Sequence, residues 1–494
     1  MHNLITRFIL ILLFTGLSQS HVFASEGSGK SNSGAIQINS EADSLIKSLP
    51  TIVETAFQES GLPSLSIAVV YDRDIIYSQA FGFADLEKQI PATTETIYPV
   101  ASITKVFVAT MLVQLAEKGV VSLDTPVKKY ITEYKIKSPY EGTQPTTLRQ
   151  LATHTSGLPR DASINFWSDY AAAEWLFSKG SSEMKWYASK EEVLANLPYI
   201  ELEYPPNSRY FYSNLGMSLL GIALQRAANE PFTEYIESHI LKPLGMDNSG
   251  FFLRKKYPSR VPTGYVYLDS ESEPLIAPEW EYGIALYSGG LYSTAEDMAR
   301  FLSLQFQDDA PGGIQIISAD GLRMMHLESL GWGYVWAPKH RGIHHDGGHL
   351  GFHAYIRAFP TLKIGVVALT NSENPLINQK PSDDIAIGIL EELKQAILTG
   401  SVSDSFDIEQ INLNKYVGEY TLPGADAEIR IELQNGYLHA KLLQDTTFDY
   451  TLNPVGNHQF GVEDDTDPWF FFQADDTGKI KSLRFIEFTF KRNQ

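Results

Sequence analysis

The chain of 494 residues contains no cysteine. This absence excludes disulfide bonds, cysteine–zinc sites and a lipid-modified cysteine anchor, and it means that folding requires no oxidant. Basic residues are also scarce, with 39 lysines and arginines against 59 acidic residues. The resulting net charge of −20 argues against nucleic acid and against an anionic membrane surface as partners, and solubility is its simplest explanation.

Long hydrophobic runs are missing after the first two dozen residues. Arg7 supplies positive charge, residues 8–17 form an apolar stretch too short to span a bilayer comfortably, and residues 22–24 loosely fit a small-residue cleavage site. We therefore expect a signal peptide over residues 1–24, with an uncleaved membrane anchor as the alternative. The mature protein is expected to be periplasmic or secreted, without stable membrane insertion.

Residues 25–40 are rich in serine, glycine and asparagine and predict a flexible leader. They include Gly29-Lys30-Ser31, a sequence that invites comparison with a phosphate-binding loop. Position 24, where such a loop needs its first glycine, is alanine, and no strand pattern precedes it. We reject the phosphate-loop interpretation and expect no cofactor.

The most informative stretch places Ser102 and Lys105 at the front of an apolar helix that is expected to end near Gly119. Residues three apart on a helix share a face, so the lysine nitrogen lies near the serine hydroxyl. Burial and a helix N-terminus both lower a lysine pKa, and a neutral amine can then take the serine proton. A Ser-x-x-Lys pair alone is weak evidence, but the apolar residues that follow it at helical spacing favour an internal position.

Tyr212 and Asn214 lie where an expected loop meets a helix that runs to about Ala228. A phenol near a lysine ammonium is biased towards phenolate and can relay a proton. The side chain of Asn214 can hold a substrate amide or orient Lys105. A buried tyrosine and a helix cap are the alternative when this pair is considered alone.

His345-Asp346-Gly347-Gly348 precedes an expected strand. A strand edge after glycines can expose an N–H group to a bound acyl group. The N–H of Gly348 can thus act as an oxyanion donor together with the N–H of Ser102, which lacks a partner in the first helical turn.

The same region is dense in residue types that bind metals. These are His344, His345, Asp346, His349 and His353. A spacing of four suits a helix, but the intervening glycines disfavour one. In a strand, residues 345, 349 and 353 share a face but lie too far apart for a single ion. We therefore expect no metal.

Two further features flank the candidate site. His154 precedes the tight turn Ser156-Gly157, and we interpret it as fastening the loop by hydrogen bonds rather than acting as a general base. Residues 160–200 form a long aromatic insert, for which core packing and a lid or pocket wall are equally good interpretations.

The strand pattern predicts a hairpin over residues 65–81 and a pair of apolar strands over residues 352–370, on either side of a helical middle. Residues 399–409 predict a polar linker. From residue 410 onward, five short strands with glycine and aspartate turns indicate a small barrel or sandwich.

The three motifs together resemble the serine β-lactamase and penicillin-binding protein family. The nearest branches are class C β-lactamases, D-aminopeptidases, DD-carboxypeptidases and family VIII esterases, and the match covers roughly residues 45–398. The motifs that carry it, in order, are Ser102-x-x-Lys105, Tyr212-x-Asn214 and His345-x-Gly347. The tail resembles the lipocalin-like barrel often appended to these hydrolases.

The resemblance implies a mixed α/β fold of the α+β type, with an antiparallel sheet flanked by helices, a helical insert and a small all-β barrel after it. The implied domains are a β-lactamase-like serine hydrolase over residues 41–398 and a barrel over residues 410–494.

The resemblance also implies residue roles. Ser102 is the nucleophile, and Lys105 and Tyr212 move its proton. The substrate-binding residues are Asn214, His345, Gly347 and Gly348, with the N–H groups of Ser102 and Gly348 as the oxyanion hole. His345 stands where true β-lactamases carry a lysine. A histidine is mostly neutral at pH 7, which weakens the case for antibiotic hydrolysis.

We therefore expect an exported serine hydrolase that forms an acyl-enzyme on Ser102 and cleaves a small amide or peptide, such as a D-amino-acid peptide or a peptidoglycan-like fragment. A carboxylesterase or weak β-lactamase is the alternative within the same mechanism. A non-catalytic ligand-binding protein, with the barrel as its ligand module, and a metallohydrolase using the histidines are alternatives of other classes. The sequence does not indicate an oligomeric state.

Overall fold

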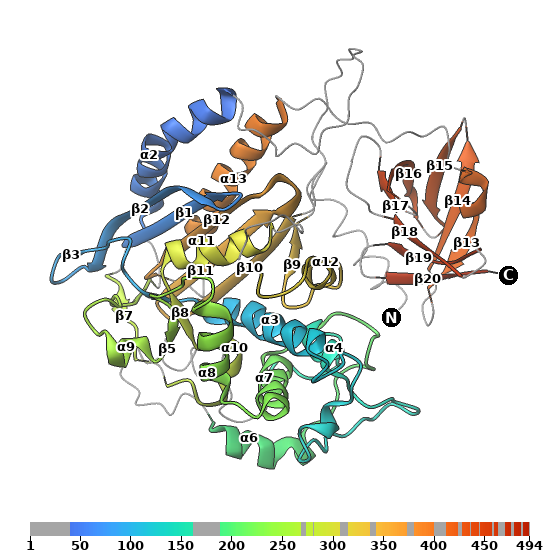
Figure 1. The fold of residues 1–494 in the computed structure, drawn as a ribbon, viewed down its shortest axis with the longest axis horizontal. Coiled ribbons are helices and arrows are strands. Elements are labelled where there is room, and N and C mark those ends of the chain that lie inside the picture. Colours follow the sequence, from blue (N-terminus) through green and yellow to red (C-terminus); the bar gives the residue numbers. More distant parts are fainter. Residues whose placement is uncertain are drawn as a thin grey trace. The chain divides into compact units, whose positions relative to one another are not determined.

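The computed structural model describes residues 40–161, 188–267, 273–279, 281–306, 315–335, 342–372, 380–399, 412–422, 427–434, 436–443, 445–456, 459–462, 470–475, 479–485 and 488–493. These residues fall into two compact units, one from residue 40 to 399 and one from residue 412 onward (Figure 1). The expected signal peptide, most of the expected linker, and residues 162–187 of the aromatic insert lie outside the described residues.

The larger unit is built on an antiparallel sheet of seven strands in the order β3-β2-β1-β12-β11-β10-β9. The predicted hairpin corresponds to β1 and β2, and the predicted apolar pair corresponds to β11 and β12. The strands are β1 (Ser64–Tyr71), β2 (Asp74–Asp85), β3 (Ile90–Pro91), β9 (Gly333–Val335), β10 (Gly342–His349), β11 (Phe352–Phe359) and β12 (Ile364–Thr370).

The two ends of this unit meet at the centre of the sheet. β1 pairs with β12 in the register Ser66 to Leu369, which joins the first strand of the unit to its last. Residues of β11 and β12 are buried along their whole length, as is nearly all of β1. A strand covered on both faces reads as a continuous apolar run rather than an alternating one, which is why these segments are recognisable in the sequence. The expected fold is therefore confirmed.

Helices cover the sheet and form the middle of the unit. α2 (Ser40–Ser60) and α13 (Pro381–Thr399) pack side by side, and α13 also packs against β11 and β12 (Figure 1). The other α-helices are α3 (Thr104–Glu117), α4 (Leu148–Ala152), α6 (Lys190–Asn196), α7 (Asn214–Ala228), α8 (Phe232–Ile236), α9 (Leu253–Lys256), α10 (Leu286–Gly289), α11 (Ala295–Leu304) and α12 (Ala319–Leu327). Short turns of other helical types are η1 (Ala101–Ile103), η2 (Val127–Lys129), η3 (Leu197–Tyr199), η4 (Glu237–Leu241), η5 (Gly283–Ala285), η6 (Pro360–Leu362) and η8 (Leu413–Tyr416).

α3 is the central helix of the larger unit. Every residue from Thr104 to Leu115 is buried, and α7, α8, α10 and α12 all contact it. A helix that is apolar on all sides is stable when other elements surround it completely. The expected internal position of this helix is therefore confirmed.

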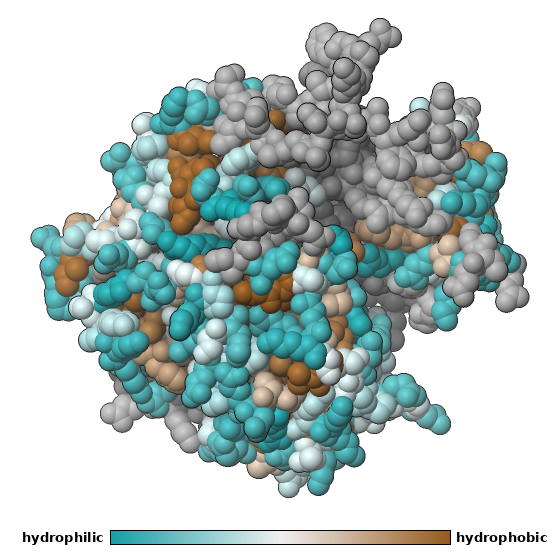
Figure 2. Space-filling model, in the orientation of Figure 1, coloured by the Kyte–Doolittle hydropathy of each residue, from teal (hydrophilic) through white to brown (hydrophobic). Residues whose placement is uncertain are grey.

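Two small sheets complete the unit. β4 (Tyr98–Pro99), β8 (Leu291–Ser293) and β5 (Gly250–Phe251) form one, and β6 (Tyr265–Val266) and β7 (Leu275–Ile276) form the other. On the face shown in Figure 2, hydrophilic residues predominate and hydrophobic residues form small patches among them. Among the described residues, no helix combines the length and apolar character needed to cross a membrane.

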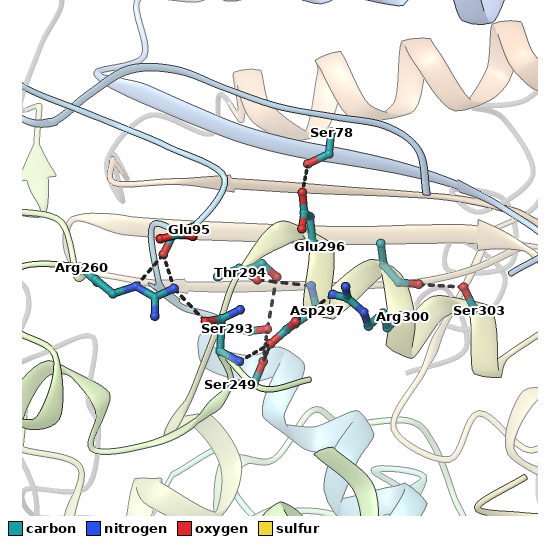
Figure 3. Close-up of polar contacts among 12 residues, drawn as sticks. Ser78, Glu95, Ser249, Arg260, Ser293, Thr294, Glu296, Asp297, Arg300 and Ser303 are labelled. Atoms are coloured by element: carbon teal, nitrogen blue, oxygen red, sulfur yellow. Dashed lines mark hydrogen bonds and ion pairs between the residues drawn. The ribbon is translucent and has the colours of Figure 1, made fainter. Parts of the chain in front are cut away.

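A buried polar network holds the three-stranded sheet to α11 (Figure 3). Oδ2 of Asp297 accepts hydrogen bonds from the backbone N–H of Asn248 and from Oγ of Ser249, both at 2.8 Å, and Oδ1 accepts one from Arg300 at 3.0 Å. Thr294 caps the helix by accepting a hydrogen bond from the N–H of Asp297. This network fixes the segment around β8, which contacts the candidate site.

The smaller unit is an eight-stranded barrel in which each strand pairs with the next and β20 pairs with β13. The expected barrel is confirmed, but the expected count of five strands is wrong, because the last expected strand, over residues 481–490, is two strands and two further strands, β16 and β17, were missed. The eight strands are β13 (Gly418–Thr421), β14 (Glu428–Gln434), β15 (Tyr437–Leu442), β16 (Asp445–Gly456), β17 (Gln459–Val462), β18 (Phe470–Ala474), β19 (Ile480–Phe485) and β20 (Phe488–Arg492).

Replacing Asp297 with alanine should lower the free energy of unfolding by about 2–4 kcal/mol, because it leaves buried donors without an acceptor. Urea unfolding of the full chain, followed by near-ultraviolet circular dichroism, measures this change. Asp320→Ala is the matched control, since Asp320 is exposed on α12, and it should change stability by about 0.5 kcal/mol or less. Equal effects of the two substitutions would contradict the role assigned to the network.

Candidate active site

Ser102 lies in η1, a single 3₁₀ turn between β4 and the start of α3. The expected helix therefore begins two residues after the serine rather than at it. β8 fixes this turn, because the N–H of Val100 donates to the carbonyl of Leu291 at 3.0 Å and the N–H of Leu291 donates to Oγ1 of Thr104 at 3.1 Å. Ala101 has a φ of +44°, a strained conformation for a residue with a side chain.

Lys105 is buried beside Ser102. Its Nζ lies 2.9 Å from Ser102 Oγ and donates a hydrogen bond to the carbonyl oxygen of Ser288, also at 2.9 Å. The side chain is 1% exposed. Burial, followed by the positive charge of Arg160, lowers the pKa of Lys105 to about 7. Much of the population near neutral pH therefore carries a free amine next to the serine hydroxyl.

Tyr212 completes the cluster. Its phenol interacts with the Ser102 side chain, and Nζ of Lys105 lies 5.0 Å from its ring centroid. Burial raises the pKa of Tyr212 above its usual value and outweighs the effects that lower it. The expected bias towards phenolate is therefore wrong, because burial disfavours the phenolate and the nearby lysine is itself partly neutral. Tyr212 is a proton donor in this state.

His154 fastens the loop that supports Tyr212, as expected. Its Nδ1 accepts a hydrogen bond from the N–H of Ser213 at 3.1 Å, and its ring stacks on that of Tyr212 with centroids 4.5 Å apart. The histidine is buried, and burial lowers its pKa well below the usual value. His154 thus acts as a neutral acceptor that positions the tyrosine.

Asn214 is the first residue of α7, and Ser213 caps that helix by accepting a hydrogen bond from the N–H of Gly216. Nδ2 of Asn214 donates to Oδ1 of Asp161 at 3.0 Å, and its backbone N–H donates to the carbonyl of Arg160 at 2.8 Å. The side chain of Asn214 therefore ties α7 to the loop before it. Lys105 is oriented instead by the hydrogen bond that its Nζ donates to the carbonyl oxygen of Ser288.

β10 lies against η1 with a very close approach at Gly347. A Cβ atom at this position would lie 2.2 Å from the carbonyl oxygen of Val100 and 3.0 Å from the backbone nitrogen of Ser102. Gly348 follows on the same strand, opposite His353 of β11. This strand can approach the serine so closely only if residue 347 has no Cβ atom, so the position requires glycine.

His345 is 7% exposed, and its ring centroid lies 6.5 Å from that of Tyr212. Its Nδ1 lies 2.6 Å from the carbonyl oxygen of Asp346, so Nδ1 carries the proton in this contact. Burial lowers the pKa of His345 to about 4. The ring of His345, which is neutral at pH 7, therefore occupies the position at which the family's lysine is expected.

The histidines of the metal-ligand set that the sequence analysis rejected have separate partners. The chain turns at Leu350 and Gly351, so the assumption that residues 345, 349 and 353 follow one strand is wrong. Nε2 of His353 lies 2.8 Å from Oδ1 of Asp383, and Nε2 of His349 lies 3.1 Å from Oη of Tyr282. Within the part of the chain that the structure describes, no group of three or more metal-ligating side chains has the geometry to hold an ion.

Sequence reasoning missed three residues that shape this site. The contact of Ser288 uses a backbone carbonyl, so no side-chain type indicates it. Arg160 and Asp161 directly follow the turn that begins at His154. A pair of opposite charges beside this turn was the sequence signal that could have identified them. The guanidinium carbon of Arg160 lies 5.2 Å from the centroid of the Tyr212 ring.

The sheet is assembled from both ends of the unit, and a serine, a lysine and a tyrosine converge beside it. This combination defines a serine hydrolase of the β-lactamase and penicillin-binding protein type. The sequence matches the family described as Beta-lactamase over residues 44–386. The chain therefore belongs to the β-lactamase family of serine hydrolases, and the resemblance drawn from its motifs is confirmed.

Several known proteins are similar to this chain. Beta-lactamase-like protein 2 of Dictyostelium discoideum is 34% identical over 261 residues, which are 52% of this chain and 44% of that protein. Penicillin-binding protein 4* of Bacillus subtilis (strain 168) is 26% identical over 424 residues, which are 79% of this chain and 87% of that protein. The crystal structure of the beta-lactamase/D-alanine carboxypeptidase from Yersinia pestis shares 25% identity, with a TM-score of 0.56 and coverage of 72% and 100% of the two chains.

Gly347→Ala should reduce kcat/KM by about 100-fold, because the new methyl group pushes β10 away from η1 and displaces the site by up to an ångström. The rate of ester hydrolysis and the rate of labelling by a fluorophosphonate both measure the effect. Gly388→Ala, at an open position on α13, is the matched control and should retain full activity. An alanine at 347 that leaves both rates unchanged would refute the close approach.

Proposed function

We propose that this chain is an exported serine hydrolase that forms an acyl-enzyme on Ser102 and cleaves a small amide, most favourably a peptide with a D-residue. The observation that carries the proposal is the buried Nζ of Lys105, with a pKa of about 7, at 2.9 Å from Ser102 Oγ. A serine hydroxyl becomes an effective nucleophile when a neighbouring neutral base takes its proton.

In the first step, Ser102 Oγ attacks the substrate carbonyl carbon while its proton moves to the Lys105 amine. The hydrogen bond to the Ser288 carbonyl uses one N–H of that amine and leaves its lone pair for the serine hydroxyl. Negative charge then develops on the carbonyl oxygen. The N–H groups of Ser102 and Gly348 are the proposed donors for that oxyanion.

In the second step, the carbon–nitrogen bond of the substrate breaks and the leaving amine needs a proton. Tyr212, neutral because burial raises its pKa, donates its phenolic proton to that nitrogen and recovers one from the Lys105 ammonium. Water then attacks the ester carbonyl of the acyl-enzyme and gives its proton to the same pair. As the bond between the carbonyl carbon and Ser102 Oγ breaks, the pair returns that proton to Oγ and the acid product leaves.

The neutral state of His345 is the reason for preferring peptides over β-lactams. A charged lysine at this place can pair with a β-lactam carboxylate, whereas His345, with a pKa of about 4, carries no charge at pH 7. The similarity to a protein titled beta-lactamase/D-alanine carboxypeptidase supports a substrate of one of these two classes, and the neutral His345 is what favours the peptide. A carboxylesterase or a weak β-lactamase uses the same steps with a different leaving group.

The packing inside the barrel helps to decide between an enzyme and a non-catalytic ligand-binding protein. The interior of the barrel is filled by buried side chains, with the aromatic rings of Tyr416, Phe460 and Phe472 in mutual contact. Eight strands enclose a space that side chains can fill completely. This packing supports the enzyme over a ligand module of the lipocalin kind.

Export is part of the proposal and is supported by the amino-acid pattern of residues 1–24. We infer a periplasmic or secreted enzyme whose partner is a small-molecule or peptide acyl substrate. Nucleic acid is not expected as a partner, given the net charge of −20.

Ser102→Ala should abolish turnover and the mass increase that a fluorophosphonate produces on the native chain. Intact-mass measurement followed by peptide mapping locates the adduct, and Ser48→Ala, on the exposed face of α2, is the matched control. A D-alanyl peptide, a nitrophenyl ester and a chromogenic cephalosporin, assayed side by side, separate the three substrate classes. Full activity in Ser102→Ala, or activity lost to a chelator and restored by zinc, would refute the serine mechanism.

Activity should rise with pH through a midpoint near 7, because Lys105 accepts the serine proton as a free amine and not as an ammonium. Below the midpoint, kcat/KM should fall about tenfold per pH unit, and above it a plateau follows. The pH profile of kcat/KM for a neutral nitrophenyl ester measures this. A midpoint near 10, the ordinary range of a lysine, would contradict the assigned role of burial.

A further inference from the structure

The positive charges around the candidate site are arranged unusually. His345 is neutral at pH 7, and Lys105 is partly so. Nζ of Lys380, at the start of α13, lies 2.6 Å from Oδ2 of Asp346 and forms an ion pair with it. Among the described residues, a cation on another element is therefore better placed to bind a substrate anion that approaches Ser102.

Arg160 is such a cation, and the backbone holds it at the site. Its carbonyl oxygen accepts hydrogen bonds from the N–H groups of Asn214 at 2.8 Å and Leu215 at 3.2 Å. These are first-turn N–H groups of α7, the helix that directly follows Tyr212. The loop that carries Arg160 is thus fixed to the same element as the proposed proton donor.

The Arg160 side chain is 48% exposed, and its guanidinium carbon lies 5.2 Å from the Tyr212 ring centroid. The phenol of the same ring interacts with the Ser102 side chain. The positive charge of Arg160 also acts on Lys105, whose Nζ lies 2.9 Å from Ser102 Oγ, so the guanidinium is near the nucleophile. A group bound by Arg160 lies close to a carbonyl under attack at Ser102.

The contact between Arg160 and its acidic neighbour is loose. Nε of Arg160 lies 3.6 Å from Oδ2 of Asp161, while Oδ1 of Asp161 accepts the hydrogen bond from Asn214 at 3.0 Å. A guanidinium has five N–H donors in a planar fork that matches a carboxylate in two parallel bonds. The fork of Arg160 can therefore bind a second carboxylate while Asp161 stays bonded to Asn214.

We propose that Arg160 is a specificity-determining residue that binds a carboxylate of the substrate next to the scissile bond. This inference rests on the proposed function and narrows it to anionic acyl compounds, above all peptides whose terminal D-residue has a free carboxylate. This anchor lies on a different element from the neutral His345.

The test uses two esters that differ in one charge, 3-carboxyphenyl hexanoate and the methyl ester of its carboxyl group. The readout is the ratio of their kcat/KM values, because any change in Lys105 affects both esters alike. In the native chain the anionic ester should be preferred. In Arg160→Gln the ratio should fall by about 10–100-fold, mainly through KM of the anionic ester, and Arg160→Lys should restore part of it.

Two variants serve as comparisons. Arg323→Gln removes an exposed positive charge from α12 and should leave the ratio unchanged. Lys380→Gln should also preserve the ratio, because Lys380 is paired with Asp346. The proposal would be overturned if Arg160→Gln kept the native ratio of the two kcat/KM values, or if Lys380→Gln lost it instead. Either result would leave the proposed serine hydrolase mechanism unaffected. If Ser102→Ala hydrolyses both esters at the native rate, the proposed function fails, and the role of Arg160 fails with it.

Discussion

The burial of one lysine amine is the constraint on which the site depends. In water the Lys105 nitrogen would be an ammonium at pH 7 and could not accept a proton from Ser102. The structure places it between Ser102 Oγ and the carbonyl of Ser288, inside a helix surrounded on all sides. Removing a charge from water costs free energy, so burial shifts the equilibrium of Lys105 towards the neutral amine. The packing around α3 that stabilises the fold therefore also lowers the pKa of the proposed base.

Much of the fold and of the candidate site could be predicted from the sequence, because the signals are local. A spacing of three on a helix brings Ser102 and Lys105 together, and strands buried on both faces appear as apolar runs. The charge state of Tyr212 could not be predicted, because it depends on a balance between burial and nearby charges that needs coordinates. The Ser288 contact comes from a backbone carbonyl, and no side-chain type indicates such an atom. Two barrel strands were missed because Pro454 interrupts the strand pattern of β16 and because β17 has only four residues.

The charge distribution explains how one fold can serve different substrates. The strand next to Ser102 has a neutral His345, and the acidic residue after it is paired with Lys380. Arg160, on the turn after α4, lies 5.2 Å from the centroid of the Tyr212 ring. If Arg160 binds the substrate as proposed, the cation that holds the substrate and the residues proposed to cleave it lie on different elements, and substrate preference can change while the cleaving residues stay the same.

The central claim, that Lys105 is a free amine near neutral pH, is tested most directly by nuclear magnetic resonance on a chain labelled with [ε-¹³C]lysine. The resonance missing from the spectrum of Lys105→Arg identifies the carbon that reports on this nitrogen. The account predicts that its chemical shift titrates with a midpoint near pH 7, several units below the other lysines. A midpoint between pH 10 and 11, together with the exposed lysines, would contradict it.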